Sequence, residues 1–560
     1  MRSNALTDWL THLPRWDPWT IVVLGVAAII ATPVIVVFSS IFADTSDTWE
    51  HLASTVLPQY VLNSLLLLVG VGIGVSVIGV GTAWLVTMCR FPGQRVFEWG
   101  LLLPLAAPSY VLAYVYTDFL EYYGPVQTVL RSLFGWDSMN DYWFPSVRSL
   151  WGAMVTLTLV LYPYVYLLSR VAFLEQSVRS LEASRSLGRG PWRSFWTVAL
   201  PLARPAIMAG LALALMETLN DFGTVDFFGV QTFTTGIYRT WFGMGERIAA
   251  SQIAACLMMF ILALILLERW SRRQARYYQM SSRFQSLSTY SLSGGRSLLA
   301  ILACTIPIIL GLILPAILLL YMTFQNWSKT MNSNFWALSY HSVVLASVSA
   351  IVAVTISLIM AYGVRLNSNW WMRLGVRISA MGYAVPGSVI AVGILIPTAQ
   401  FDNWVDGWMR SVLGISTGLL ITGSVVALVL AYLVRFLAVA LNTVESSLIQ
   451  IRPSLDDASR CLGRSPLQTL ISVHAPLMWS GILTGIMIVF VDVMKELPAT
   501  LVMRPFNFDT LAVQVYRYAS DERLAEASAP ALAILLVGLV PVIVLSAQIA
   551  RSRSRNPSAH

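Results

Sequence analysis

Residues 457–466 read Asp-Ala-Ser-Arg-Cys-Leu-Gly-Arg-Ser-Pro, and residues 182–191 read Glu-Ala-Ser-Arg-Ser-Leu-Gly-Arg-Gly-Pro. The first stretch runs on to Pro476 and the second to Pro201, so the shared glycines (Gly188 and Gly463) and the closing prolines keep one constant offset along the chain. Both stretches are polar, whereas the rest of the chain is mostly apolar. The repeat therefore predicts two copies of one functional element.

The composition of the chain indicates a membrane protein. Of its 560 residues, 57% are hydrophobic and only 11% are charged, whereas a soluble protein carries roughly 25% charged residues. Lysine and arginine outnumber aspartate and glutamate, 36 to 28, but they are spread over short loops. That distribution is typical of membrane topology and not of a nucleic-acid-binding face, so we expect no nucleic acid partner.

The apolar segments predict an all-α polytopic protein with about 12 transmembrane helices, because a spanning helix needs about 20 apolar residues. The expected spans lie near residues 20–42, 59–87, 97–118, 149–169, 203–221, 248–268, 298–322, 338–364, 378–398, 416–442, 477–501 and 528–549.

The basic residues predict the orientation of the chain. With the N-terminus inside, 25 of the 36 lysines and arginines fall on inside loops and 8 on outside loops, and cytoplasmic loops are the Lys/Arg-rich ones. Both termini and both polar copies are then cytoplasmic. The N-terminus lacks a short apolar core with a small-residue cleavage site, so we expect no removable signal peptide.

The repeat extends well beyond these two polar stretches. His341-Ser342 matches Asn63-Ser64 and Pro386 matches Pro108, again at one shared offset. The sequence predicts a first permease domain at 1–268, a polar, basic cytoplasmic linker at 269–297 and a second permease domain at 298–560. Six spans in each half make a parallel repeat with its axis along the membrane normal. A duplication kept for packing alone is the alternative.

Each polar copy is predicted to form a helix, a sharp turn and a second helix, within cytoplasmic loops 175–201 and 443–476. Gly188 suits the left-handed position after the first helix, and Gly463 should do the same in the second copy. Ser465 before Pro466 predicts an N-cap followed by a proline in the first turn. Pro201 and Pro476 are expected to close the second helices. An ordinary surface loop is the alternative.

The two copies resemble the signature of ABC-importer permease subunits: Glu-Ala-Ala, a glycine six residues after the Glu, and a proline thirteen after that glycine (the EAA motif). The matching residues here are Glu182, Ala183, Ser184, Gly188, Pro201, Asp457, Ala458, Ser459, Gly463 and Pro476. Serine replaces the second alanine in both copies, and aspartate replaces glutamate in the second. The resemblance implies a fused permease whose coupling helices sit in grooves of a separate ATP-binding subunit, a homodimer.

The chain itself lacks a nucleotide site of the P-loop type. That site needs Gly-Lys-Ser/Thr to hold phosphates, and the two lysines, Lys329 and Lys495, follow Ser328 and Met494. We therefore expect no cofactor on this chain, no enzyme activity of its own, and ATP used by the partner subunit.

Four acidic residues within spans suggest a translocation path, because charges inside a membrane are costly and usually functional. Glu217 and Asp221 lie in the fifth span, and Asp492 and Glu496 lie in the eleventh, at the same offset as the two polar copies. Each pair is spaced i, i+4 and is expected on one helix face. A weakly binding electrostatic lining, not a tight metal site, suits transport. The alternative is capping or ion pairing, with Lys495 as a partner.

Other polar groups in the spans have plainer interpretations. Tyr110, Tyr114 and Tyr116 could supply hydroxyl groups to the path, although aromatic packing is the favoured role. Arg435, near the cytoplasmic end of the tenth span, is explained by snorkelling of its guanidinium to the interface.

Two further stretches resemble the ferric-iron branch of these permeases: residues 216–226 continuing to 242, and residues 495–500 continuing to 517. The resemblance implies a ferric-iron permease of a bacterial inner membrane, served by a periplasmic iron-binding protein. Outside loops near 119–148, 222–247 and 502–527 are expected to receive that protein through mixed charges.

Two other functions remain open at this point. A permease of the same class for thiamine or a polyamine would also suit the carboxylates, because both cargoes are cationic. An ion-coupled secondary transporter would also use internal repeats and intramembrane acids, but it would work without an ATPase.

Overall fold

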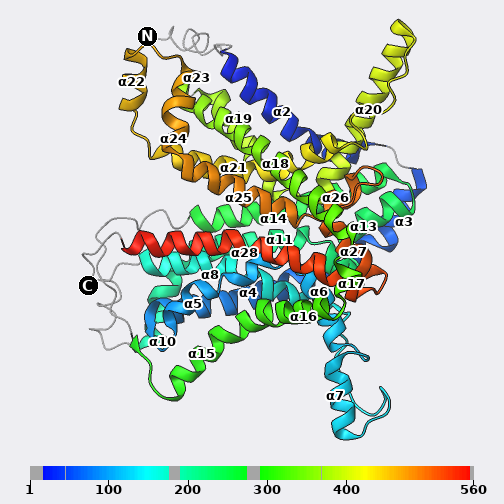
Figure 1. Cartoon of the computed structure of the whole chain (residues 1–560), viewed down its shortest axis with the longest axis vertical. Coiled ribbons are helices and arrows are strands. Elements are labelled where there is room, and N and C mark those ends of the chain that lie inside the picture. The colour runs from blue at the N-terminus through cyan, green and yellow to red at the C-terminus, as the bar shows by residue number, and fades with distance from the viewer. Residues whose placement is uncertain (1–16, 44–45, 176–189, 274–289, 368, 555–560) are drawn as a thin grey trace. The chain divides into compact units, whose positions relative to one another are not determined.

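A computed structural model describes residues 17–43, 46–175, 190–273, 290–367 and 369–554. These residues are almost entirely helical, as the sequence predicts (Figure 1). Within the described ranges the only strands are β1 (Cys89–Arg90) and β2 (Tyr290–Ser291), which pair in parallel. The all-α fold class is confirmed.

The helices gather into two compact units that interleave along the sequence. Unit 1 holds residues 1–43 and 340–509, and unit 2 holds residues 44–339 and 510–560. The units do not coincide with the predicted permease domains 1–268 and 298–560, since each unit takes segments from both sequence halves. The division of the chain at its linker therefore stays a prediction about the repeat.

Unit 2 contains most of the first half and the end of the chain. Its helical elements are α3 (Ser46–Thr55), α4 (Leu57–Met88), α5 (Gln94–Gly100), η2 (Leu103–Ala106), α6 (Ser109–Leu120), α7 (Pro125–Phe134), α8 (Leu150–Glu175), α10 (Pro191–Ser194), η3 (Phe195–Ala199), α11 (Leu200–Asn220), α12 (Gly223–Phe227), α13 (Phe233–Tyr238), η4 (Arg239–Gly243), α14 (Arg247–Arg273), α15 (Gly295–Ile308), η5 (Ile309–Ile313), α16 (Leu314–Gln325), α17 (Trp327–Thr330), α27 (Leu511–Ser520) and α28 (Leu524–Ser554).

Unit 1 contains the first span and most of the second half. Its helical elements are α2 (Pro18–Ser39), η1 (Ser40–Phe42), α18 (Ser333–Leu366, which begins in unit 2), α19 (Trp370–Ser379), η6 (Gly382–Ala384), α20 (Gly387–Leu413), α21 (Val425–Ile449), α22 (Ser454–Cys461), α23 (Pro466–Thr469), η7 (Leu470–His474), α24 (Ala475–Leu477), α25 (Trp479–Met494) and α26 (Pro498–Met503).

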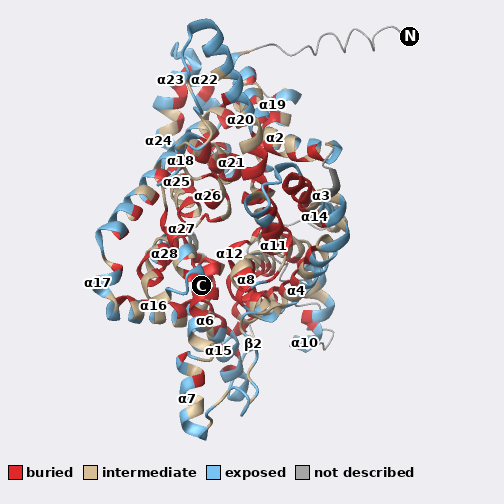
Figure 2. Ribbon diagram, turned by 90° about the vertical axis from the view of Figure 1, so that its right-hand side faces the viewer, coloured by how far each residue is buried: buried red, intermediate tan, exposed pale blue. Residues whose placement is uncertain are grey.

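Close backbone contact holds the centre of unit 2 together, where α4 packs along α8 and α11. A Cβ on Gly79 of α4 would come within 2.9 Å of the backbone nitrogen of Tyr166 in α8. Small residues let membrane helices approach closely, since apolar burial gives them little drive to associate in lipid. Figure 2 shows buried residues concentrated where α8 and α11 lie.

The first span, α2, belongs to unit 1 through its packing on α19 and α20. A Cβ on Gly393 of α20 would lie 2.5 Å from the carbonyl oxygen of Pro33 in α2. The ring of Trp19 packs edge-on against Tyr362, with 5.8 Å between ring centroids. These contacts join residues of the first half to the second half within one compact unit.

The described residues contain nine helices that could span a membrane, or up to 12 when three bent pairs are each counted as one span. The predicted number of spans lies within this range, but several boundaries are wrong, among them those of the tenth and eleventh spans. The tenth span begins at Val425, because residues 415–424 form an irregular return loop. The eleventh span ends at Met494, and the chain then starts the separate helix α26 at Pro498.

Short π-helical turns precede three prolines within helical segments. They are η3 before Pro201, η5 before Pro315 and η7 before Pro476. A proline ring clashes with the carbonyl four residues earlier and lacks an N–H donor, and a widened turn accommodates both defects. Pro201 therefore lies inside a continuous candidate span, Trp192–Asn220, and the prediction that it closes a helix is wrong. Pro476 lies one residue before its helix ends.

Candidate functional site

The second polar copy has the local structure that its sequence predicts. Helix α22 ends at Cys461, and Gly463 then takes φ = +74°, a left-handed conformation that a side chain disfavours. Ser465 caps α23 by accepting a hydrogen bond from the Gln468 N–H, and the Gln468 side chain accepts one from the Ser465 N–H. This capping box fixes the start of α23.

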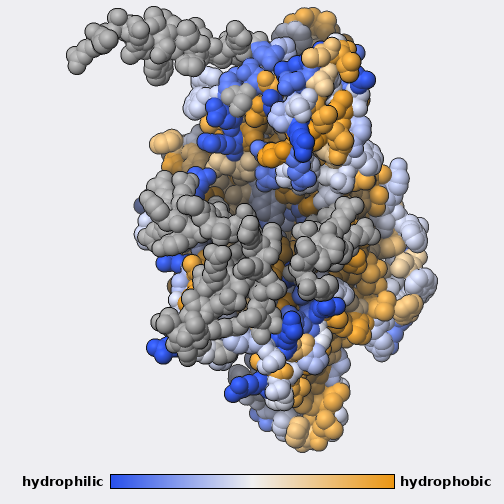
Figure 3. Space-filling model, turned by 90° about the vertical axis from the view of Figure 1, so that its left-hand side faces the viewer, coloured by the Kyte–Doolittle hydropathy of each residue, from blue (hydrophilic) through white to orange (hydrophobic). Residues whose placement is uncertain are grey.

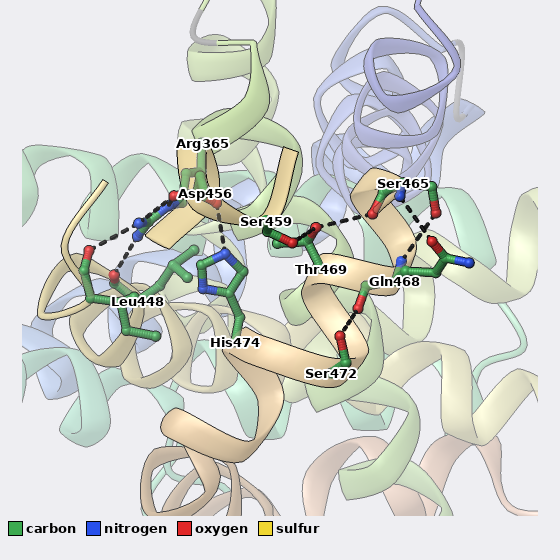
Figure 4. A network of polar contacts seen from close by, with 10 residues as sticks. Arg365, Leu448, Asp456, Ser459, Ser465, Gln468, Thr469, Ser472 and His474 are labelled. Carbon is green, nitrogen blue, oxygen red and sulfur yellow. Dashed lines mark hydrogen bonds and ion pairs between the residues drawn. The ribbon is translucent and has the colours of Figure 1, made fainter. Parts of the chain in front are cut away.

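A buried ionic network holds α22 against the end of α18 (Figure 4). Arg365 donates from Nε and Nη2 to Asp456 Oδ2 at 2.9 and 2.6 Å. It also donates to the carbonyl oxygens of Leu448 and Ile451 at 2.7 and 2.9 Å. His474 Nε2 lies 2.7 Å from Asp456 Oδ1, and its side chain is fully buried. One carboxylate thus ties α18, α22 and η7 together.

The same network determines the charge of Asp456. Burial alone would raise the pKa of Asp456, but hydrogen bonds from Arg365 and His474 outweigh burial and hold that pKa below its ordinary value. The carboxylate is therefore ionised throughout the neutral range. A second contact, 2.7 Å between the hydroxyls of Ser459 and Thr469, closes α22 onto α23. Figure 3 shows hydrophilic side chains gathered at this end of unit 1.

The first polar copy falls largely outside the described residues. Glu182, Ala183, Ser184 and Gly188 lie within residues 176–189, so their predicted placement stays a prediction. The description resumes at Gly190 and α10, and the chain passes through η3 into α11.

In unit 2, Asp221 caps the short helix α12. Its Oδ1 accepts hydrogen bonds from the N–H groups of Thr224 and Val225 at 3.0 and 3.1 Å, and its Oδ2 accepts from the hydroxyls of Ser109 and Thr224 at 2.6 and 2.9 Å. Both oxygens are thus engaged. Glu217 is half-buried one turn earlier, on α11.

In unit 1, Glu496 caps α26 in the equivalent way but carries an ion pair as well. Its Oε1 accepts from the Ala499 N–H at 3.0 Å and lies 3.3 Å from Arg435 Nη1. Glu496 and Arg435 are only 5% and 7% exposed. The interpretation of Arg435 as a snorkelling residue is therefore wrong, because its guanidinium compensates a buried carboxylate.

The acids of each pair do not share one helix face. Helix α11 ends at Asn220, and Asp221 has an extended conformation with ψ = 132°. Helix α25 ends at Met494, so Glu496 also lies beyond its span. The i, i+4 prediction is wrong because each second acid uses its carboxylate to start the next short helix. Lys495 pairs with Asp492 at 2.9 Å.

One position explains why the two acids have different partners. Ser109 in the first half corresponds to Gly387 in the second, since each directly follows one of the matched prolines Pro108 and Pro386. A Cβ on Gly387 would lie 2.5 Å from Glu496 Oε1 and 2.7 Å from Arg435 Nη1. A hydroxyl therefore satisfies the acid in unit 2, whereas an absent side chain leaves room for a guanidinium in unit 1.

The tyrosines of α6 fit the predicted packing role. Tyr110, Tyr114 and Tyr116 are all buried. The ring centroids of Tyr110 and Tyr114 lie 5.8 Å apart, and those of Tyr114 and Phe227 of α12 lie 4.5 Å apart. Tyr116 donates its hydroxyl to the Leu310 carbonyl oxygen.

Both sequence halves match one protein family, described as the inner membrane component of binding-protein-dependent transport systems. The matches cover residues 75–277 and 353–555. The chain belongs to this family. It is thus the permease component of an ABC importer, a multi-pass membrane protein that is not itself an ATPase.

Individual relatives of this permease differ in how much of the chain they match. The Fe(3+)-transport system permease protein FbpB 2 of Haemophilus influenzae is 27% identical over 542 residues, covering 95% of this chain and 99% of the relative. The ferric transport system permease protein FbpB of Actinobacillus pleuropneumoniae is 21% identical, covering 93% and 76%. The molybdenum transport system permease protein ModB of Escherichia coli is 29% identical but covers only 35% of this chain and 86% of its own.

The sequence analysis missed two residues of the permease's polar networks, Arg365 and His474, and misinterpreted a third, Arg435. A comparison of the two halves would have found them, because their counterparts are the uncharged Thr87, Val160 and Ala199. Charges present in one copy of a repeat and absent from the other need partners of their own. Among the described residues, no group of three or more His, Cys, Asp or Glu side chains is placed to hold a metal ion.

Proposed function

We propose that this permease carries ferric iron across the bacterial inner membrane. The observation that supports this most is that permeases named for ferric transport match it from end to end across both halves. The molybdenum and sulfate permeases match only 35% and 40% of the chain. Carboxylates in the spans are compatible with a hard cation, although they do not distinguish iron from thiamine or a polyamine.

The proposal includes two partners and an orientation. A homodimeric ATP-binding subunit would bind the coupling segment, defined as residues 454–476, and its first-half counterpart at the cytoplasmic face. A periplasmic iron-binding protein would deliver cargo at the other face. Both termini would then be cytoplasmic, because the Lys/Arg-rich loops face that side.

Cargo identity is tested by uptake in a bacterial strain that lacks its own ferric importer. Expression of the permease with its ATPase and binding protein should restore uptake of radioactive iron, and unlabelled thiamine or spermidine should not compete. A hydrolysis-deficient ATPase is the control and should reduce uptake to background. Restored uptake of thiamine or spermidine without iron would assign the other cargo class.

Within the proposed path, we expect Glu217 and Asp492 to attract the cation, because fixed negative charge acts strongly in a low-dielectric pore. Iron uptake should fall in Glu217→Gln and further in the double variant with Asp492→Asn. Asp492→Asn should be the more harmful single change, since it also removes the ion pair between Asp492 and Lys495.

The exposed Glu445→Gln provides a matched control that removes a carboxylate elsewhere in unit 1. Membrane levels of each variant must be equal. Full uptake by a normally inserted double variant would contradict a role of these two acids in the path.

A further inference from the structure

Each unit carries a folded extension with an uncovered apolar face. In unit 1 it is the α20 arm, defined as residues 399–424: the outer half of α20 and the loop that returns to α21. In unit 2 it is the α7 arm, defined as residues 121–149. Figure 1 shows α20 leaving the body of unit 1 and α7 leaving the body of unit 2.

The apolar residues of the α20 arm form a stripe along one side of the helix. Phe401, Trp404, Trp408 and Val412 are 47–67% exposed, and their spacing of three or four residues places them on one helix face. The return loop adds Ile415, Leu419 and Leu420, each more than half exposed.

The charged residues of the same arm all make hydrogen bonds or ion pairs within it, so the apolar stripe belongs to a folded element. Asp402 accepts hydrogen bonds from the N–H groups of Ile421 and Thr422 at 2.7–3.2 Å. Asp406 accepts from the N–H groups of Thr417 and Gly418 at 2.8 and 2.9 Å and pairs with Arg410 at 2.7 Å. The two acids hold the loop against the helix and leave the tryptophans facing outward.

We propose that these arms rest in the interfacial region of the bilayer, with the apolar stripe against lipid. The stripe is continuous with a spanning surface, because the return loop leads into Val425 and Val426, which are exposed at the start of the candidate span α21. Tryptophan favours the level of the lipid headgroups, where its ring is apolar and its N–H can be solvated. An amphipathic helix with such a face lies in the interface.

The charges of the α20 arm argue against a soluble protein as the occupant. The sequence of the arm contains three charged residues, Asp402, Asp406 and Arg410, and all three are engaged within the arm. Little charge remains to steer a soluble partner. A partner that dissociates in each transport cycle would also leave this apolar surface in water, which soluble surfaces avoid.

The α7 arm repeats the design in unit 2, and the proposal assigns its apolar face to lipid and not to the binding protein that the sequence analysis expects at the loop near 119–148. Arg131 donates to the Tyr122 carbonyl oxygen at 2.7 Å and lies 3.9 Å above its ring, and Gln127 donates to the Leu120 carbonyl oxygen at 2.7 Å. The apolar residues on its outside are Val129, Leu133, Phe134, Met139 and Trp143, all 54–86% exposed. Figures 1 and 2 show α7 projecting sideways from the helices of unit 2, as a helix along the membrane plane would.

An environment-sensitive fluorophore on single cysteines tests the proposal, in a full-length background whose four cysteines are replaced by serine. Trp404→Cys and Trp408→Cys report on the stripe, and Asn403→Cys, exposed on the opposite side of the helix, is the matched control. Leu133→Cys gives an independent measurement on the α7 arm, with Ser132→Cys as its control. The permease is reconstituted in phosphatidylethanolamine and phosphatidylglycerol vesicles, with and without lipid brominated on its acyl chains.

Contact with lipid predicts blue-shifted emission at positions 404, 408 and 133 and its loss in brominated lipid, with water-like emission at 403 and 132. Water-like, unquenched emission at 404, 408 and 133 would overturn the proposal. If the stripe instead binds a soluble partner, emission at 404 and 408 should be water-like in the permease alone and should shift to the blue only when that protein and the ATPase are added. That result would also overturn the proposal. Equal quenching at 403 and 404 would also overturn the proposal, because lipid would then contact both sides of the helix and not the apolar stripe alone.

Discussion

Replacing Arg435 with methionine should abolish transport and lower the amount of folded permease. The substitution leaves Glu496 as a buried carboxylate with 5% exposure and no guanidinium beside it. Removing one member of a buried ion pair costs about 3–5 kcal/mol. Glu496 also caps α26 through the Ala499 N–H, so protonation or displacement of the carboxylate would release that helix.

The charge requirement can be separated from packing by restoring neutrality. Arg435→Met with Glu496→Gln should recover folded protein relative to Arg435→Met, because neither charge is then left unpaired. The exposed Arg377→Met removes the same charge from the surface of unit 1 and should be nearly neutral. The measurement is detergent-solubilised thermal unfolding together with iron uptake. Equal losses in the single and double variants would show that the guanidinium acts by packing and not by charge.

The first half supplies a sharper exchange. Its equivalents of Gly387, Arg435 and Glu496 are Ser109, Val160 and Asp221. The triple variant Gly387→Ser, Arg435→Val, Glu496→Asp therefore supplies the serine hydroxyl and the shorter acid that the chain already uses there, without the Thr224 hydroxyl, whose counterpart is Ala499. We expect the triple variant to be more stable than Arg435→Val alone. If it is as unstable as the single change, the two caps are not interchangeable.

The sequence predicted features whose cause is local. Gly463 takes a left-handed conformation after α22, and Ser465 caps the helix that Pro466 begins, because turns and caps depend on residues a few positions apart. The network around Asp456 escaped prediction because Arg365 lies 91 residues away. Only the fold brings these groups together.

Apolar length predicted the spans but not where they break. In the eleventh span, apolar residues continue past Glu496, so the run alone suggests one helix to residue 501. The structure ends the helix at Met494, because Pro498 favours the first turn of a new helix and Glu496 caps it. Pro498 thus indicates the helix break within a segment that is otherwise apolar.

The membership of α2 in unit 1 could not be predicted for a different reason. The segment is apolar all round, so no polar face marks which side meets lipid and which meets α20. Its partners are fixed by close fits such as Pro33 against Gly393, and such fits are not visible in a single sequence.

The second large effect is expected at the coupling segment, where Arg365→Met should release the ATP-binding subunit. The change removes every hydrogen bond that Arg365 makes to Asp456, Leu448 and Ile451 and leaves Asp456 buried with only His474. A loss of about 3–5 kcal/mol is expected for such a residue. Each 1.4 kcal/mol of this loss that is taken from the binding free energy of the ATPase weakens its binding about tenfold. We therefore expect the affinity for the ATPase to fall at least about tenfold, and co-purification of the ATPase to fall with it.

The pH dependence of this contact follows from the lowered pKa of Asp456. A carboxylate whose pKa is lower in the folded state stabilises that state above its unfolded value, about 3.9, and loses the effect as pH falls through the folded value. The contribution of this carboxylate to ATPase retention should therefore be constant between pH 8 and pH 6. Since His474 contacts the same carboxylate, a loss within that range that persists in His474→Gln would mean that Asp456 is not held ionised.

Arg452→Met is the matched control, since Arg452 is exposed in the loop between α21 and α22 and its replacement removes the same charge. Limited trypsin digestion supplies a readout that does not depend on the ATPase: Arg460 and Arg464 should be cleaved faster in Arg365→Met once α22 is no longer held against α18. Faster cleavage with normal ATPase retention would keep the structural role of Arg365 but reject this segment as the coupling contact. Wild-type behaviour in both measurements would reject both, because the network would then contribute nothing to the position of α22.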